Sequence, residues 1–271
     1  MKRLRVGVIY GGRSSEHEVS LASAAAVFAN LDPARYEAIP IHIDRHGRWS
    51  LAERPPTVVS PADVIERATA APDTSRALCE AHLVADPTNQ TVVTIQRDTD
   101  DGGRAIVAGL SLDIVFPVVH GPYGEDGTLQ GLLELAAVPY VGAGVLASAV
   151  AMDKAVAKVL FAARGLPQVD HLTVDGSTWD ADRAGTLDRL EAELPFPVFV
   201  KPANLGSSVG VSKAGERAAL ERAVDLARRY DRKIIVEAAV PEARELECAV
   251  LGNDAPEASV PGEILPSRDF Y

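Results

Sequence analysis

A loop rich in glycine and serine, beside a lysine, is the segment of this sequence best suited to hold an anion. It runs from Lys201 to Gly210 (KPANLGSSVG) and follows the apolar run that begins at Val198. Backbone N–H groups and hydroxyls in such a loop can approach a phosphate closely, and Lys201 adds a positive charge. The spacing differs from a P-loop. The composition therefore predicts a phosphate cradle, with an ordinary surface turn as the alternative.

Two patterns in the sequence imitate other kinds of site. Gly206 to Gly210 satisfies the GxSxG pattern of a hydrolase, with Ser208 as nucleophile, but all six histidines precede Ser208 and the next residues read as a strand. That pattern requires a later histidine and a helix, so a hydrolase is disfavoured. Gly142 to Ala147 resembles a dinucleotide fingerprint but lies in mid-chain. We predict close packing of a strand against a helix there.

Polar residues also follow apolar runs elsewhere, where α/β proteins place ligands. The loop from His120 to Gly127 (HGPYGEDG) contains three glycines. His120 and Glu125 would either serve a site or satisfy buried backbone groups. Glu16 and His17 stand at the start of a helix, where an acid complements the helix dipole or faces a substrate ammonium. The residue types alone do not choose between these roles.

A buried strand is indicated from Ile234 to Val240, running into a short linker. Its backbone could contact the edge of an adenine, with Glu237 near the amino group. A strand of this kind does not identify a nucleotide site without the other motifs.

The elements that must position these residues begin with a β-α-β unit. Leu4 to Tyr10 is a β-branched run that ends at two glycines, and Tyr36 to Ile43 is a second strand. Between them, Val19 to Leu31 is an Ala-rich helix, and Ser15 and Glu18 have the spacing of a capping box. This order predicts a parallel sheet with helices on its faces.

Further along the chain the pattern alternates between strands and helices. In residues 44–110 we expect a helix at Ala62–Ala70 and two strands, Thr91–Ile95 and Ala105–Ala108, joined by a hairpin connection at 98–103, as decoration on the first domain. Asp153 is a good N-cap for a helix that ends at Arg164. The other expected strands are Asp113–Val119, Pro139–Val141, Val169–Val174, Val198–Lys201, Val209–Lys213 and Lys233–Ala238; the other expected helices are Thr128–Ala137, Trp179–Leu194 and Glu216–Tyr230; antiparallel strands are expected at Glu245–Leu251 and Glu257–Ile264.

Composition places the chain among soluble globular proteins. It has 271 residues, 47% of them hydrophobic, and a formal net charge of −11. That charge disfavours broad attraction to nucleic acid or an anionic membrane. The uncharged stretch from Leu135 to Met152 is interrupted by Pro139 and glycines, which favours strand, turn and buried helix over a membrane span. Cys79 and Cys248 match no metal spacing and are expected to be a reduced, buried pair.

Taken together and in order, these motifs resemble the D-alanine–D-alanine ligases of the ATP-grasp superfamily. The resemblance runs nearly end to end and is weakest over residues 44–110. The matching segments are Gly11–Ser20 (GGRSSEHEVS), His120–Gly131, Met152-Asp153-Lys154, Lys201-Pro202 with its Gly/Ser loop, and Arg244–Cys248 (RELEC).

The resemblance implies a role for each site residue. In the first part of the chain, Glu16 would hold the ammonium of the first D-alanine and His120 would lie near its carboxylate. Ser207 would help to organise the Gly/Ser loop, which would close over the nucleotide. The residues expected to bind ATP are Lys154, Lys201, Gly206, Ser207, Ser208 and Val209 around the phosphates, Glu237, Ala238 and Val240 at the adenine, and Glu245 at the ribose.

The resemblance also implies a domain plan that this chain does not complete. The expected fold is α/β, with a parallel-sheet N-terminal domain followed by an α+β ATP-grasp region whose second half is incomplete. The expected domains are an N-terminal substrate domain (1–145), a central ATP-grasp subdomain (146–240) and the start of a C-terminal subdomain (241–271). The family's ligands for Mg²⁺ (or Mn²⁺) would lie beyond Tyr271, so we expect no metal ligands here and little or no catalysis by this chain alone.

The implied activity is ATP-dependent ligation of two D-alanines through an acyl phosphate, for peptidoglycan precursor synthesis. The implied partners are ATP and D-alanine, in a cytoplasmic homodimer that binds neither nucleic acid nor membrane. One alternative is a non-catalytic protein that binds a nucleotide or an amino acid. Another is an ATP-grasp ligase that acts on a different carboxylate and amine.

Overall fold

The computed structural model describes residues 2–57, 79–87, 92–97 and 105–265, and the chain in it forms two compact units, residues 1–157 and 158–271. The expected helix at 62–70 and the connection at 98–103 lie outside the described residues. Each unit has its own sheet and its own core. The predicted division at residues 145 and 240 stays a prediction.

The first unit is built on a mixed seven-stranded sheet with the strand order β6-β5-β4-β3-β2-β1-β7. β2, β1 and β7 are parallel, as the β-α-β pattern predicts, and β3 to β6 continue the sheet as antiparallel strands from the region expected to be decoration. The strands are β1 (Leu4–Gly11), β2 (Tyr36–Ile43), β3 (Trp49–Leu51), β4 (Cys79–Leu83), β5 (Val92–Arg97), β6 (Ala105–Leu110) and β7 (Ile114–Pro117).

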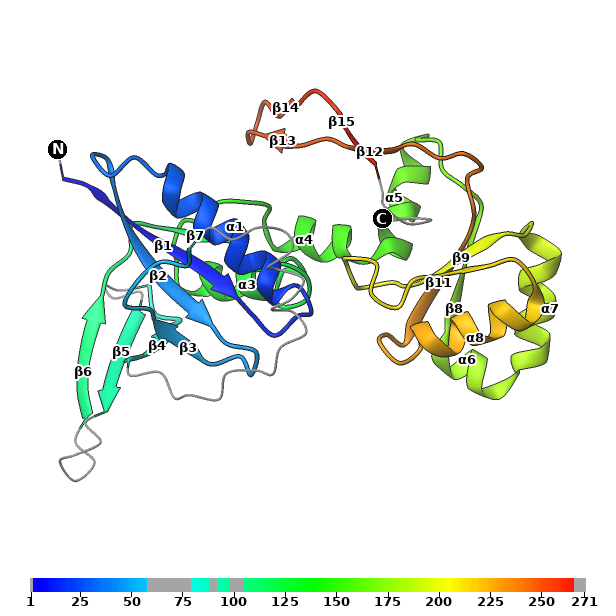
Figure 1. Cartoon of the computed structure of the whole chain (residues 1–271), viewed down its shortest axis with the longest axis horizontal. Coiled ribbons are helices and arrows are strands. Elements are labelled where there is room, and N and C mark those ends of the chain that lie inside the picture. Colours follow the sequence, from blue (N-terminus) through cyan, green and yellow to red (C-terminus); the bar gives the residue numbers. More distant parts are fainter. Residues whose placement is uncertain (1, 58–78, 88–91, 98–104, 266–271) are drawn as a thin grey trace. The chain divides into compact units, whose positions relative to one another are not determined.

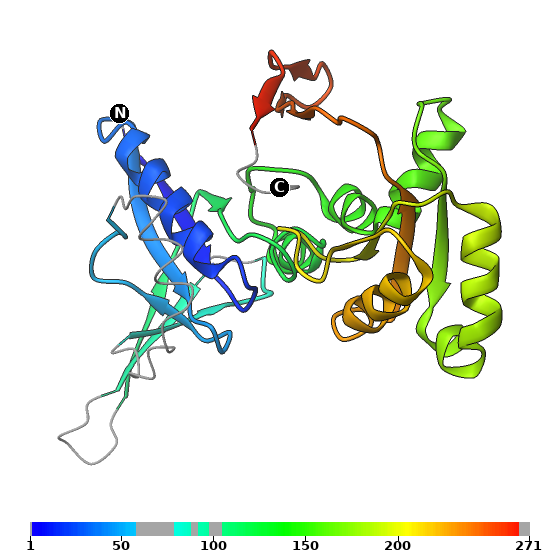
Figure 2. The same cartoon turned by 45° about the vertical axis from the view of Figure 1, so that its right-hand side comes forward.

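Helices cover both faces of this sheet around β1. Val6, Val8 and Tyr10 pack against Ala24 of α1 (His17–Asn30), whereas Ile9 packs on the other face with Leu129 of α3 (Thr128–Leu135). Side chains alternate between the faces of a strand, so one apolar strand serves two cores. Figures 1 and 2 show α1 running along β1 and β2. Two further helices follow, α4 (Val145–Met152) and α5 (Lys154–Ala163).

Three local expectations in this unit are corrected. α1 begins at His17 with Glu16 at the N-cap, and Glu18 pairs with Arg45 at 2.9 Å, so Ser15 and Glu18 form no capping box. The strand expected at 139–141 is reduced to a single bridge between Val115 and Tyr140. The glycines near 142 do not pack closely, since a Cβ at Gly142 would meet nothing within 4 Å; its φ of +115° is what requires glycine.

The second unit contains an antiparallel four-stranded sheet with the order β10-β9-β11-β8. The predicted long helix is two helices, because Asp182 leaves the helical conformation and its side chain accepts a hydrogen bond from Gly185 N, which caps the second helix. The elements are β8 (His171–Asp175), α6 (Gly176–Ala181), α7 (Arg183–Glu193), β9 (Val198–Pro202), β10 (Ser212–Ala214), α8 (Arg217–Ala227), β11 (Lys233–Ala238), β12 (Glu245–Glu247), β13 (Val250–Leu251), β14 (Glu257–Ala258) and β15 (Gly262–Ile264).

Helices α6, α7 and α8 cover one face of this sheet (Figure 1). Val198 and Val200 of β9 and Ile234 and Val236 of β11 point into that core. Trp179 of α6 is fully buried there, and its indole N–H donates to Asp225 Oδ1 at 2.9 Å. The residues between these valines and isoleucines therefore face the other side of the sheet.

The remaining expectations concern the end of the chain, the cysteines and the apolar stretch. β12 pairs with β15 and β13 with β14, which confirms the antiparallel strands. Both cysteines are free, but Cys248 is exposed and Cys79 only partly buried, so the expected burial is wrong. Among the described residues, no helix is both long and apolar enough to cross a membrane.

We predict that Trp179→Ala lowers the free energy of unfolding of the second unit by about 3–5 kcal/mol, because it leaves a cavity among α6, α7 and α8. Trp179→Phe keeps most of the packing and loses the bond to Asp225, so its cost is about 1 kcal/mol. Urea unfolding followed by far-UV circular dichroism measures both changes. Equal midpoints for the wild type and Trp179→Ala would contradict this account.

Candidate functional site

An ion pair lies on the face of the second sheet that α6, α7 and α8 leave open. Lys201 is the residue after inward-facing Val200, and Glu237 follows inward-facing Val236. Lys201 lies opposite Ile235 in the antiparallel register, so Glu237 is its diagonal neighbour. Long side chains can meet across a diagonal pair. Lys201 Nζ donates to Glu237 Oε2 at 2.6 Å.

A second lysine, which the sequence analysis missed, joins this pair. Lys158 of α5 lies 3.1 Å from the other oxygen of Glu237, Oε1. The Glu237 side chain is only 9% exposed and that of Lys158 only 13% exposed. Burial by itself would raise the pKa of Glu237, but the hydrogen bond and charge of Lys201, followed by those of Lys158, hold that pKa below its ordinary value. The carboxylate is therefore ionised at neutral pH.

A cavity of about 400 Å³ opens beside the Lys201–Glu237 pair. It brings together five of the residues expected to bind ATP, because β9, β11 and the following linker all contribute to its wall. Half of its ten lining residues are charged and half are apolar, so it can contact both charged and apolar parts of a small molecule. The lining residues are Val169, Phe199, Lys201, Lys213, Glu237, Ala238, Val240, Glu242, Ala243 and Glu245.

The Gly/Ser loop leaves the end of β9, the strand that carries Lys201. Ser207 and Ser208 are exposed and have positive φ angles of 47° and 55°, and Val209 N donates to Gly206 O at 3.2 Å. None of residues 206–209 is among those that line the cavity. Because β10 follows the loop and no helix begins there, the hydrolase pattern at Ser208 lacks the context it needs.

In the first unit, Glu16 and His120 lie on neighbouring loops at the carboxyl ends of β1 and β7. Ser14 joins them: its hydroxyl donates to His120 O at 2.7 Å and accepts from Glu16 N at 3.2 Å. A Cβ added at Gly121 would collide with Glu16 Oε2, so the carboxylate lies directly against the glycine backbone. His120 Nε2 lies 3.1 Å from Ser23 Oγ.

The acidic residues of the 120–127 loop have structural partners. Glu125 accepts a hydrogen bond from Gly121 N at 2.6 Å, and Asp126 accepts from Thr128 N at the start of α3. Both carboxylates therefore satisfy backbone groups, which was one of the two roles considered. Lys154 lies in the first unit, in the first turn of α5, and its nucleotide role stays a prediction.

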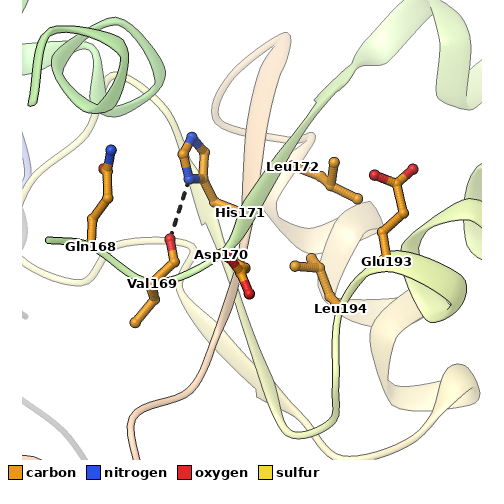
Figure 3. Close-up of a pocket in the computed structure, with 7 residues that line it drawn as sticks. All are labelled: Gln168, Val169, Asp170, His171, Leu172, Glu193 and Leu194. Atoms are coloured by element: carbon orange, nitrogen blue, oxygen red, sulfur yellow. Dashed lines mark hydrogen bonds between the residues drawn. The ribbon is translucent and has the colours of Figure 1, made fainter. Parts of the chain in front are cut away.

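A second cavity, of about 340 Å³, lies at the edge of the second sheet (Figure 3). Residues from Gln168 to Leu172 line one side, and Glu193 and Leu194 line the other. His171 Nδ1 lies 3.3 Å from Val169 O. No residue expected to bind a substrate lines this cavity, and its wall contains no lysine or arginine to hold a phosphate.

In the part of the chain that the structure describes, no group of three or more His, Cys, Asp or Glu side chains could hold a metal ion. The prediction that the family's metal ligands lie beyond Tyr271 stays a prediction.

Comparison with known families connects both units to one kind of enzyme. A family model described as D-ala D-ala ligase N-terminus matches residues 5–143, and one described as D-ala D-ala ligase C-terminus matches residues 160–271. The chain belongs to the D-alanine–D-alanine ligase family. The resemblance drawn from the motifs is thereby confirmed.

Relatives in this family share nearly half of their aligned residues with the chain. The D-alanine–D-alanine ligase of Solibacter usitatus is 48% identical over 269 residues, which are 99% of this chain and 66% of the relative. That of Heliobacterium modesticaldum is 47% identical over 273 residues, 100% of this chain and 69% of the relative. The chain thus spans about two thirds of the length of these relatives.

Solved structures of the same family confirm the fold. The VanG D-Ala:D-Ser ligase from Enterococcus faecalis has a TM-score of 0.76 and 33% identity, covering 97% of this chain and 70% of that one. The D-alanine–D-alanine ligase from Coxiella burnetii has a TM-score of 0.76 and 38% identity, covering 97% and 71%. The predicted α/β fold with an ATP-grasp region is therefore confirmed, with the antiparallel extension of the first sheet added.

His17, at the start of α1, and His42, on β2, form a pair of aromatic rings in the first unit. The ring centroids of His17 and His42 are 5.5 Å apart, and His17 Nδ1 donates to Gly12 O at 2.8 Å. Burial, followed by the charge of His17, lowers the pKa of His42 below its ordinary 6.5, although Asp44 and Glu18 oppose this.

We predict that His42→Gln weakens the pH dependence of stability between pH 7 and pH 5. The unfolded chain binds the His42 proton more tightly than the fold does, so stability is fully present above about pH 6.5 and falls as the pH drops below that value. Urea unfolding at several pH values measures the difference between the wild type and the variant. His46→Gln, at an exposed histidine nearby, is the matched control, and parallel curves for wild type and His42→Gln would refute the prediction.

Proposed function

We propose that this protein joins two D-alanine molecules to form D-alanyl-D-alanine, converting ATP to ADP and phosphate, for peptidoglycan precursor synthesis. The two family models and the curated relatives support this reaction. The observation that carries the proposal is the cavity in the second unit. Its wall places an ionised carboxylate and a lysine beside apolar surface, which suits a nucleotide.

In this proposal the cavity holds the adenosine part of ATP. Phe199, Ala238 and Val240 supply apolar surface for the base, Glu237 accepts from the adenine amino group, and Glu245 accepts from the ribose hydroxyls. All of these residues line one cavity in the second unit, which is the support for grouping them.

The proposal assigns the phosphates to the lysines and the Gly/Ser loop. Lys201 turns toward them, Lys154 adds a second positive charge, and the backbone and hydroxyls of Gly206, Ser207, Ser208 and Val209 close over them. Mg²⁺ or Mn²⁺ belongs to the family's reaction, and the described residues contain no cluster to hold it.

The reaction proceeds in two transfers. A carboxylate oxygen of the first D-alanine attacks the γ-phosphorus of ATP, and ADP leaves as an acyl phosphate forms. The amine of the second D-alanine then attacks the acyl carbon, loses a proton, and phosphate departs as the peptide bond forms. Such chemistry depends on positioning and on neutralising charge. Glu16 holds the first ammonium, His120 lies near the first carboxylate, and the closed loop keeps water from the acyl phosphate.

The cellular setting is part of the proposal. We place the protein in the cytoplasm, as a homodimer whose small-molecule partners are ATP and D-alanine. The net charge of −11 supports the absence of nucleic acid and of an anionic membrane surface from this list.

The function is tested by phosphate release from ATP with Mg²⁺, comparing D-alanine with L-alanine. Two proteins are assayed: this chain, and this chain joined to the remaining C-terminal residues of the Solibacter usitatus relative, of which it spans 66%. We expect release by the joined protein to require D-alanine and mass spectrometry to find D-alanyl-D-alanine. Binding of ATP with no D-alanine-dependent release by either protein would favour a non-catalytic binding protein.

We predict that Glu16→Gln raises the KM for the first D-alanine by about 10- to 100-fold, because a hydrogen bond that an ammonium donates to a carboxylate contributes about 1.5–3 kcal/mol. The KM for ATP should stay within twofold, and steady-state kinetics on the active protein separates the two. Glu18→Gln is the matched control, since Glu18 pairs with Arg45. Equal D-alanine KM values for the wild type and Glu16→Gln would remove Glu16 from this role.

A further inference from the structure

Glu237 has a different lysine on each of its two carboxylate oxygens. Lys201 Nζ lies 2.6 Å from Oε2, and Lys158 Nζ lies 3.1 Å from Oε1. Lys201 lines the nucleotide cavity and its side chain is 28% exposed, whereas Lys158 is outside the lining and only 13% exposed. The proposed reaction gives Lys201 a task at the phosphates and leaves Lys158 without one.

Lys201 cannot pair with Glu237 and bind the phosphates of ATP at the same time. A lysine that turns toward the phosphates of ATP leaves Glu237 Oε2, the oxygen to which it donates in the free protein. A buried carboxylate that loses its partner is costly, and it avoids the cost by taking up a proton. A protonated Glu237 would carry a hydroxyl donor on one oxygen and would be a weaker acceptor for the adenine amino group, which is itself a donor. The site therefore needs another positive charge at Glu237 that ATP does not draw away.

We propose that Lys158 is a positioning residue that keeps Glu237 ionised when Lys201 moves to the nucleotide phosphates. Lys158 thereby maintains the preference for a 6-amino purine over a 6-oxo purine. This inference rests on the proposed nucleotide site. Lys158 suits the role because it comes from α5, on the Oε1 side of the carboxylate, and is more buried than Lys201.

The surroundings of Glu237 identify Lys158 as the group able to do this. Of the described residues, Lys158 and Lys201 are those that form ion pairs with Glu237. Other charged or titratable residues lie nearby: Lys213 of β10, Glu242 and Glu245 line the same cavity, and His171 of β8 is opposite Glu237 in the sheet register. The charges of Lys201 and Lys158 are the ones that lower the pKa of Glu237.

The test measures the affinities of this chain for ATP and for ITP by isothermal titration calorimetry from pH 5.5 to pH 8.5. ITP carries a 6-oxo group in place of the amino group, so the ratio of the two affinities reports the protonation of Glu237. For the wild type we expect a preference for ATP that stays constant over this range.

For Lys158→Met we expect the ATP-over-ITP ratio to fall about tenfold at the acid end and to recover as the pH rises, since a tenfold change corresponds to one pKa unit. Lys158→Arg keeps the charge and should retain the wild-type ratio. In the Glu237→Gln background, Lys158→Met should leave the ratio unchanged, because the group on which it acts is gone. Thermal unfolding of each variant shows that it is folded, and Lys158→Gln takes the place of Lys158→Met if the latter is not.

Three results would overturn the inference in distinguishable ways. A Lys158→Met ratio equal to that of the wild type at every pH would show that Lys201 or water suffices at Glu237. An equal loss of affinity for ATP and ITP would show that Lys158 acts on the phosphates. Failure of the wild-type chain to bind either nucleotide would reject the nucleotide site itself, and the inference with it.

Discussion

The second unit depends on one constraint: a carboxylate that is 9% exposed must stay compensated by positive charge. Glu237 follows two fully buried residues, Ile235 and Val236, on its strand, and its low exposure leaves water only a small part of the compensation. Lys201 and Lys158 supply it instead, from the adjacent strand and from α5. Breaking a buried pair by removing one partner is strongly destabilising, so this cluster ties α5 to the sheet while presenting a polar face to the cavity.

In the first unit the constraint is the narrow space between two loops. Two loops from parallel strands converge where Glu16 lies against Gly121, and a Cβ at Gly121 would force the Glu16 carboxylate to shift. Ser14 links the same loops through His120 O and Glu16 N. The backbone that carries Glu16 is thus linked to the loop of His120 before any ligand arrives, which lowers the entropy that binding must remove.

Several features were predictable because they depend on residues close in sequence. The helix after Asp153 is one, since Asp153 Oδ1 accepts from Ala155 N and Val156 N as an N-cap should. Others failed because a distant partner intervened. Glu18 was expected to complete a capping box, but its side chain forms an ion pair with Arg45 instead. Glu125 could have served a substrate, and Gly121 N takes its carboxylate instead. The spacing of residues close in sequence does not reveal such competition from distant partners.

The sequence by itself determined the family, the β-α-β opening, the Gly/Ser loop and half of the residues that line the cavity beside Glu237, because motifs and turn chemistry are local. Only the tertiary structure decided that β3 to β6 extend the first sheet in antiparallel fashion and that Lys201 and Glu237 are diagonal neighbours. It also decided that Lys158 completes their cluster. The physical reason is that strand register and the approach of α5 follow from packing between segments far apart in the chain, which no short window of sequence contains.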